Sequence, residues 1–193
     1  MRENEAGARV AAAAALRNLA IANVENQAAS VQAGVIKPLV ELLQDEAAGA
    51  QEDAAFMLAN LAANNANHQT WIAKAGAIPP LVELLESGVP EVQEASSMVL
   101  RNLAGDNPRN SAAIAEAGAV MPLMRLLDAS ASGAQKQAAW ALWNLAAADV
   151  ANLEEIMQAG VVAPLIKILG AELPALHDEI AELLLKADHS TAD

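Results

Sequence analysis

The chain has 193 residues, a net charge of −13 at pH 7 and no cysteine. The negative charge argues against nucleic acid and membranes as partners, because nucleic acid and anionic membranes both bind basic surfaces. The lack of cysteine excludes disulfides and thiolate metal sites, and no apolar run fits a signal peptide or a membrane-spanning helix. We therefore expect an intracellular protein of the cytoplasm, the nucleus or both.

A period of 42 residues organises the chain. Asn-Leu-Ala recurs at this interval, starting at Asn18, Asn60, Asn102 and Asn144. Four glycines and four Pro-Leu pairs share the interval: Gly34, Gly76, Gly118 and Gly160, and Pro38, Pro80, Pro122 and Pro164. A fixed period of this length is typical of a solenoid of stacked helical units, none of which can bury its apolar face alone.

The first predicted element is a helix over residues 4–22, which carries the first Asn-Leu-Ala. No companion helices precede it, so one side of its alanine run, residues 11–15, would be open to water. Four units are predicted to follow, over about 23–64, 65–106, 107–148 and 149–193, and the whole chain is predicted to form one domain.

Each unit is predicted to contain three helices, which in the third unit cover about 108–117, 119–128 and 133–147. Gly118 can adopt the left-handed conformation of a tight corner between the first two helices. Pro122 falls in the first turn of the second helix, where a missing N–H costs little. In the last unit, a helix over about 174–187 has Lys186 where the asparagine belongs, and its polar outer face suits a terminal cap.

Two stretches and the four Asn-Leu-Ala helices resemble the armadillo repeat family over nearly the whole chain. The stretches read NQAASVQAGVIKPLVELL (26–43) and NHQTWIAKAGAIPPLVELL (67–85). The related HEAT repeats fit less well, because they lack the glycine corner between a short first helix and the second. The resemblance implies an all-α, right-handed superhelix similar to importin-α and β-catenin.

The four asparagines are the main candidate binding residues. In armadillo proteins the third helices line a concave groove, and the resemblance implies that Asn18, Asn60, Asn102 and Asn144 bind the main chain of an extended peptide. A carboxamide offers both a donor and an acceptor, as a peptide unit does. Stacked helices lie about 8–10 Å apart and two extended residues span about 6.6 Å, so each unit could bind one dipeptide. The alternative is that these asparagines cap the C-termini of their helices.

The position four residues before each asparagine holds Ala14, Phe56, Met98 and Trp140 in turn. In importin-α-like members a tryptophan here forms the walls between which long side chains lie. Only Trp140 matches that pattern, which makes it the predicted side-chain pocket, with Trp143 at the edge of the groove. Phe56 and Met98 could contribute, or could serve only to pack one unit on the next.

Charged residues near the asparagines are mixed in sign. Seven or eight positions before an asparagine lie Glu52, Asp53, Glu94 and Lys136, and immediately before one lie Arg17 and Arg101. An acidic groove would favour a lysine-rich ligand, and the two arginines oppose that reading. A basic, mixed or acidic peptide is therefore allowed, and these charges could also form a merely solvated face.

No pattern in the chain predicts catalysis. The three histidines, His68, His177 and His189, lack the spacing of metal ligands. No set of nucleophile, base and oxyanion donor is evident, and there is no phosphate-binding glycine loop. We expect neither cofactor nor metal. Trp71, in the register of a first helix, is predicted to be partly exposed and to lie flat on its neighbours.

The sequence thus predicts a non-catalytic scaffold that binds an extended or disordered segment of another protein. Two alternatives remain open. The array could self-associate through its N-terminal end, or it could be the substrate-recognition part of a larger protein such as a ubiquitin ligase.

Overall fold

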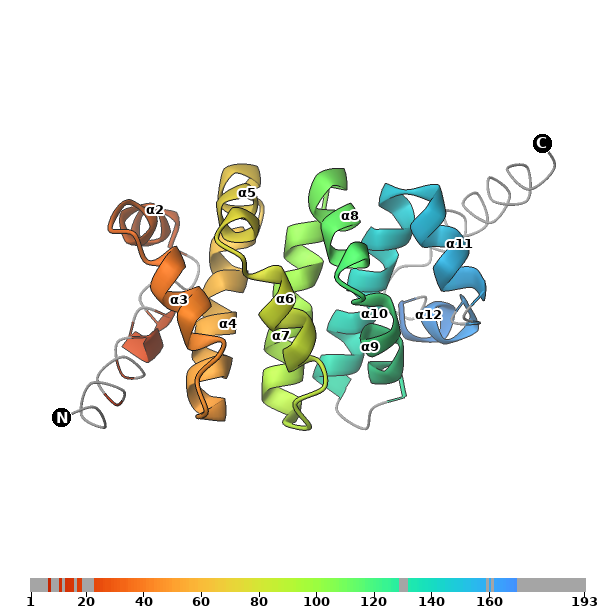
Figure 1. The fold of residues 1–193 in the computed structure, drawn as a ribbon, viewed down its shortest axis with the longest axis horizontal. Helices are drawn as coiled ribbons and strands as arrows, with labels where there is room; N and C mark the ends of the chain where they lie inside the picture. Colours follow the sequence, from red (N-terminus) through yellow and green to blue (C-terminus); the bar gives the residue numbers. More distant parts are fainter. Residues whose placement is uncertain are drawn as a thin grey trace.

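A computed structural model describes residues 7, 11, 13–15, 17–18, 23–128, 132–158, 160 and 162–169. Within these residues every regular element is a helix. The helices repeat in groups of three along one axis, from the N-terminal end to the C-terminal end (Figure 1). The prediction of an all-α solenoid is confirmed.

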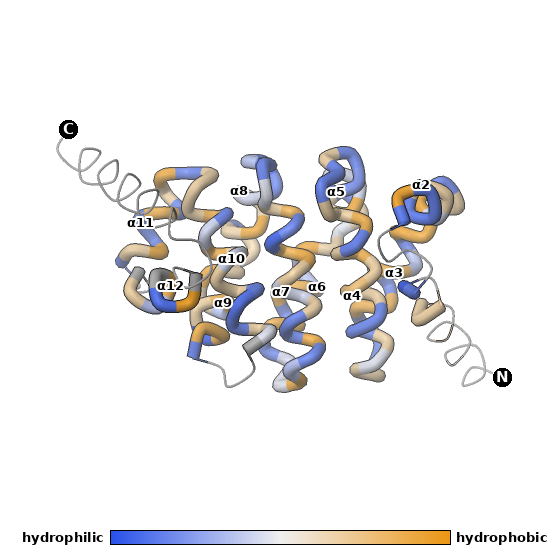
Figure 2. The backbone as a smooth tube through the Cα atoms, turned by 180° about the vertical axis from the view of Figure 1, so that it is seen from behind, coloured by the Kyte–Doolittle hydropathy of each residue, from blue (hydrophilic) through white to orange (hydrophobic). Residues whose placement is uncertain are grey.

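The three helices of each unit form three parallel rows. The first helices are α2 (Val24–Gln32), α5 (Ala66–Lys74), α8 (Pro108–Glu116) and α11 (Val150–Gln158). The second helices are α3 (Ile36–Leu42), α6 (Ile78–Leu84), α9 (Val120–Leu126) and α12 (Val162–Leu169). The third and longest helices are α4 (Ala48–Ala62), α7 (Pro90–Ala104) and α10 (Ser132–Ala148). Viewed from behind, α4, α7 and α10 lie side by side (Figure 2), and the α4–α7 and α7–α10 pairs make the most extensive contacts of the array.

Small residues let the third helices approach closely. Ala54 and Ala55 on α4 and Ala138 and Ala139 on α10 are fully buried. Alanine is the best helix former and leaves little side chain between two backbones. The second helices contribute the larger apolar side chains, and the leucine after each repeated proline is buried: Leu39, Leu81, Leu123 and Leu165.

The predicted glycine corner is present between the first and second helices. Gly118 has a φ of +78°, a conformation that costs a residue with a Cβ roughly 1–2 kcal/mol. The second helix that follows is shorter than the predicted 119–128, because Ala119 is its N-cap and Leu127 is its C-cap. Leu127 N–H bonds to the Met124 carbonyl, which tightens this end into a 3₁₀-type turn.

Polar side chains at the start of the first helices form hydrogen bonds on both sides of the junction between a third helix and the next first helix. The side chains of Asn23, Asn65 and Asn107 cap the N-termini of α2, α5 and α8. Three further side chains reach back to the last turn of the preceding third helix. His68 Nδ1 bonds to the Leu61 carbonyl at 2.9 Å, Asn110 Nδ2 to that of Leu103 at 3.1 Å, and Asn152 Nδ2 to that of Leu145 at 3.3 Å. Each therefore satisfies a carbonyl that the helix itself leaves without a partner.

The two predicted end helices fall mostly outside the described residues. Of the leading helix, the described positions are helical; Ala13 is buried, whereas Ala11 and Ala15 are exposed. The predicted cap over 174–187, with Lys186, lies beyond the last described residue.

Candidate functional site

A groove of about 760 Å³ runs across the face of α4, α7 and α10. Amide side chains dominate its wall. The lining residues are Ala59, Asn60, Ala63, Asn64, Asn65, Ala66, Gln69, Met98, Arg101, Asn102, Gly105, Asp106, Trp140 and Asn144. The groove thus brings together three of the four repeated asparagines with Met98, Arg101 and Trp140.

Two of these asparagines bond across the helix–helix interface. Asn102 Nδ2 donates to the Ala59 carbonyl of α4, and Asn144 Nδ2 donates to the Arg101 carbonyl of α7, each at 3.0 Å. A carbonyl oxygen only accepts, so the nitrogen of each carboxamide must face the preceding helix. Both side chains are half-buried. Each carboxamide keeps Oδ1 and its second Nδ2 hydrogen for another partner.

The other two asparagines differ from this pair. Asn60 lines the groove and is half-buried, but its side chain makes no bond to another described residue. Asn18 is exposed and is not part of the lining. Capping of the third helices falls to His68, Asn110 and Asn152, while Asn102 and Asn144 bond to neighbouring helices instead.

Arginine and aromatic side chains meet in the same way at two places. The Arg101 guanidinium carbon lies 5.8 Å from the centre of the Trp140 ring, and its Nη1 donates to Gln137 Oε1 at 2.9 Å. At the other place, the Arg17 guanidinium carbon lies 5.0 Å from the centre of the Phe56 ring, and Arg17 Nη1 donates to a carboxylate oxygen of Asp53 at 2.6 Å. At both places a cation covers an aromatic face, a contact of about 0.5–1 kcal/mol when exposed.

A model of the plant U-box protein ARM repeat region matches residues 1–191 of the chain. The chain belongs to this armadillo repeat family. No curated protein matches its sequence.

Several designed solenoids share the fold of this armadillo array. A designed armadillo repeat protein is 30% identical over 92% of this chain and 73% of its own, with a TM-score of 0.77. A second, in complex with the peptide (KR)4, is 28% identical over 94% and 81%, also with a TM-score of 0.77. A further engineered protein is 35% identical over 92% and 72%, with a TM-score of 0.79.

The remaining predicted site residues of the armadillo array lie off the groove wall. Glu52 and Asp53 face Arg17, with the shortest Arg17–Glu52 contact at 3.7 Å, so the arginine is neutralised and the cluster keeps one net negative charge. Phe56 lies beneath the Arg17 guanidinium. Trp143 is half-buried and packs against the core.

Two predicted charged residues, Glu94 and Lys136, lie near the start of α10 and are not part of the groove lining. A Cβ placed on Gly133 would lie 1.9 Å from Glu94 Oε2, so the Glu94 carboxylate rests against the first turn of that helix. Lys136 lines a separate cavity of about 910 Å³ with Lys167 of α12.

Sequence reasoning missed the rim of the groove. Asn64 and Asn65 line it from the α4–α5 junction, Gln69 from α5 itself, and Gly105 and Asp106 from the α7–α8 junction. Asn64 has a φ of +53° and Asp106 a φ of +51°. Asparagine and aspartate tolerate this left-handed region better than most residues. The signal in the sequence is their separation by one repeat, directly after a third helix.

The described residues contain no group of three or more His, Asp or Glu side chains that could hold a metal ion. None of the described helices is long and apolar enough to cross a bilayer. His68 is buried, with its ring centre 5.6 Å from that of Trp71. Trp71 is 47% exposed, as its register predicts.

Proposed function

We propose that this armadillo array is a non-catalytic interaction scaffold that binds an extended peptide segment of another protein. The segment lies along α4, α7 and α10 and is held by the carboxamides of Asn60, Asn102 and Asn144. The observation that carries the proposal is the pair of interhelical bonds from Asn102 and Asn144, which orient each carboxamide and leave a donor and an acceptor unused. The designed relative in complex with (KR)4 supports the same use of the fold.

The orientation of these carboxamides also gives the ligand a direction. Each bonded Nδ2 faces the preceding helix, so Oδ1 lies on the side of the following one. A ligand residue that bonds to both atoms presents its N–H to Oδ1 and its C=O to Nδ2. Since the N–H of a residue precedes its C=O along a chain, the peptide runs antiparallel to the array.

Main-chain bonds alone do not give a stable complex. Three carboxamides with two bonds each would contribute roughly 3–9 kcal/mol net, and association costs at least about 4 kcal/mol in lost translational and rotational freedom. A micromolar complex needs about 8 kcal/mol. Ligand side chains must therefore supply the difference, and Met98, Arg101 and Trp140 are the groove residues placed to contact them.

A peptide-array screen with three proteins tests the proposal: the wild type, Asn60→Ala and Asn67→Ala. Asn60 lines the groove without an interhelical bond to a described residue, so its removal leaves that bonding pattern unchanged. Asn67 is an exposed asparagine on α5 that does not line the groove, and it serves as the matched control. We expect at least about a fivefold loss of affinity in Asn60→Ala and none in Asn67→Ala. Equal binding by all three proteins would contradict the proposal.

Single cysteines can test the direction, because the chain has none of its own. Ala63 and Ala147 are exposed and occupy equivalent positions two repeats apart, Ala63 directly after α4 and Ala147 in the last turn of α10. A nitroxide at Ala63→Cys is expected to broaden the NMR signals of the C-terminal half of a bound peptide. One at Ala147→Cys is expected to broaden those of the N-terminal half. The reverse pattern would show parallel binding.

A second candidate role follows from the family match. Because the matching model describes the repeat region of plant U-box proteins, we infer that the array could act as the substrate-recognition part of a longer protein such as a ubiquitin ligase. Ubiquitin transfer to a peptide-bearing substrate, assayed with the full-length gene product, tests this role. Transfer that persists in an Asn60→Ala variant with impaired peptide binding would argue against it.

A further inference from the structure

Of the two arginine–aromatic pairs of the array, only the first has carboxylates beside its arginine among the described residues. Arg17 has two carboxylates within 4 Å, those of Glu52 and Asp53. Arg101 bonds instead to Gln137, a neutral amide, and makes no ion pair with any described carboxylate. Asp53 and Gln137 occupy the same repeat position, two units apart. The array therefore keeps the cation at the second pair but lacks its counter-ion there.

The Arg101 guanidinium is held by two contacts: its Nη1 donates to Gln137, and it lies over the Trp140 ring. The bond from Asn144 to the Arg101 carbonyl fixes the main chain of the same residue. Such restraint lowers the entropy that the side chain loses when it binds a partner. A guanidinium has five N–H donors, so the single bond to Gln137 leaves four for a ligand.

The face of the Trp140 ring that Arg101 covers is therefore not open to a cation from a ligand. A lysine or arginine brought to this ring would meet the Arg101 guanidinium at close range, and like charges repel. A carboxylate brought to the same place would meet an unpaired, partly buried guanidinium. Arginine binds carboxylates through two parallel N–H bonds, which gives geometric selectivity as well as energy.

We propose that the groove selects an extended peptide with an Asp or Glu side chain, whose carboxylate pairs with Arg101 above Trp140. This inference rests on the proposed function, because Asn102 and Asn144 place the ligand main chain beside the same subsite. Asp106, the acidic residue of the groove lining, is exposed at the rim after α7, where water screens its charge.

The selectivity is opposite to that suggested by the basic peptide (KR)4 in the designed relative. It also runs against the net charge of −13, which repels acidic ligands at long range. A charge-assisted pair contributes about 1–1.5 kcal/mol more than a neutral hydrogen bond, so replacing the carboxylate with an amide should weaken binding by about five- to tenfold.

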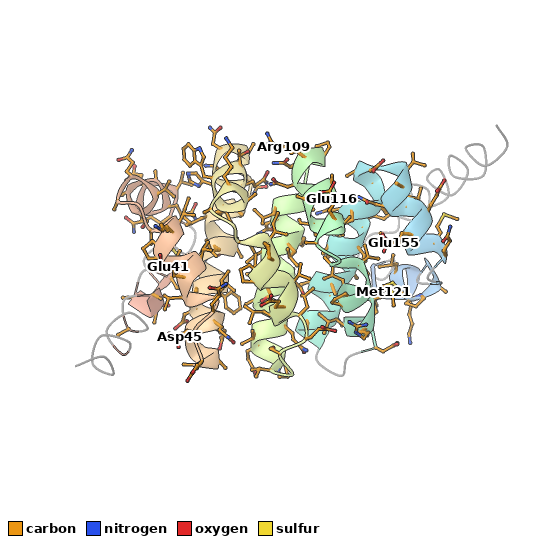
Figure 3. All side chains as sticks on the ribbon, in the orientation of Figure 1. Glu41, Asp45, Arg109, Glu116, Met121 and Glu155 are labelled. Carbon is orange, nitrogen blue, oxygen red and sulfur yellow. The ribbon has the colours of Figure 1, made fainter. Side chains whose placement is uncertain are left out.

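The test uses a library of extended peptides in which Glu, Gln or Lys occupies each position in turn, with affinities measured by fluorescence anisotropy. For the wild type we expect Glu to be preferred over Gln at one position by at least about fivefold, with Lys weaker still. Arg101→Gln should abolish this preference and Arg101→Glu should reverse it toward Lys. Arg109→Gln is the matched control, since Arg109 is exposed on α8 (Figure 3) and does not line the groove.

A second variant leaves Arg101 untouched. Gln137→Asp restores at this pair the carboxylate that Arg17 already has, and circular dichroism verifies that each variant is folded. We expect Gln137→Asp to lower the affinity for the Glu peptide by about tenfold and to leave the Gln peptide unchanged. A Glu preference that survives in both Gln137→Asp and Arg101→Gln would overturn the inference.

The outcomes separate the inference from the proposed function. Binding of Lys peptides in preference to Glu peptides, with a loss in Asn60→Ala, would overturn the acidic selectivity and retain the peptide-binding groove. Absence of binding by every peptide in the library would overturn both.

Discussion

Asn144 Nδ2 donates to the main-chain carbonyl of Arg101 at 3.0 Å, so a side chain that lines the groove also joins α10 to α7. An equivalent bond one repeat earlier joins Asn102 of α7 to the Ala59 carbonyl of α4. Stability and recognition are therefore coupled at these residues. An asparagine here has two roles, whereas Asn60 has only the groove role among the described residues.

The double role predicts unequal effects on stability. Asn144→Ala removes a bond to a partly buried carbonyl and should lower the free energy of unfolding by about 1 kcal/mol. Asn60→Ala should change it by less than half as much. Urea denaturation followed by circular dichroism compares the two variants. Similar midpoints for both would contradict the interhelical role of Asn144.

Ser96 is predicted to destabilise the array as it stands. Its hydroxyl is fully buried and has no hydrogen-bond partner among the described residues, and the equivalent positions hold the buried alanines Ala54 and Ala138. Ser96→Ala should raise the free energy of unfolding by about 1 kcal/mol, because burying an unpaired hydroxyl costs roughly 1–3 kcal/mol.

The neighbouring Ser97 is the control for this change. Its hydroxyl donates to the Gln93 carbonyl at 2.7 Å, so Ser97→Ala removes a bond that is made. Thermal melts should place Ser96→Ala above the wild type and Ser97→Ala at or below it. A lower melting temperature for Ser96→Ala would contradict the prediction.

Two glycines should respond to alanine in opposite ways. Gly118 has a φ of +78°, so Gly118→Ala should destabilise the array by about 1–2 kcal/mol, although a Cβ there would meet no atom within 4 Å. Gly105 has a φ of −58° and a ψ of +120°, close to those of Ala63 one repeat earlier. Gly105→Ala should therefore stabilise by about 0.4–1 kcal/mol by restricting the unfolded chain. Chemical denaturation of both variants tests the pair.

The bond from His68 to Leu61 predicts a tautomer. Because a carbonyl only accepts, the hydrogen must lie on Nδ1 in the neutral ring, and ¹⁵N NMR of the imidazole should show the Nδ1–H form. His68→Asn should retain most of the stability, since Asn110 makes the same bond one repeat later. His68→Ala should lose about 1 kcal/mol. Equal losses in the two variants would show that this bond contributes nothing.

Most of what could be predicted about the fold and the groove followed from the repeat period. Residues such as Gly118 and Leu123 recur at one interval, and their roles depend only on local backbone conformation and burial. The prediction that Asn102 and Asn144 line a third-helix face depends on helical pitch, which is also local. The structure places both in the groove wall.

Contacts between units were harder to predict, because they depend on the offset between stacked helices. Arg101 and Trp140 lie 39 positions apart, as do Arg17 and Phe56, and nothing in a single helix brings either pair together. Their recurrence at the same spacing was the available signal. The rim residues Asn64 and Asp106 lie in junctions whose path is set by the stacking of neighbouring units.

The side chains that close the ends of α4, α7 and α10 come from the next unit along the chain, at His68, Asn110 and Asn152. A fragment cut at the boundary between two units would end in a third helix whose last-turn carbonyl has lost its side-chain hydrogen bond. Shortened versions of the array, and hybrids assembled from units of different parents, should therefore be joined within the glycine corner. A junction at that corner keeps each third helix in the same fragment as the following first helix, whose side chain bonds to its C-terminal carbonyl.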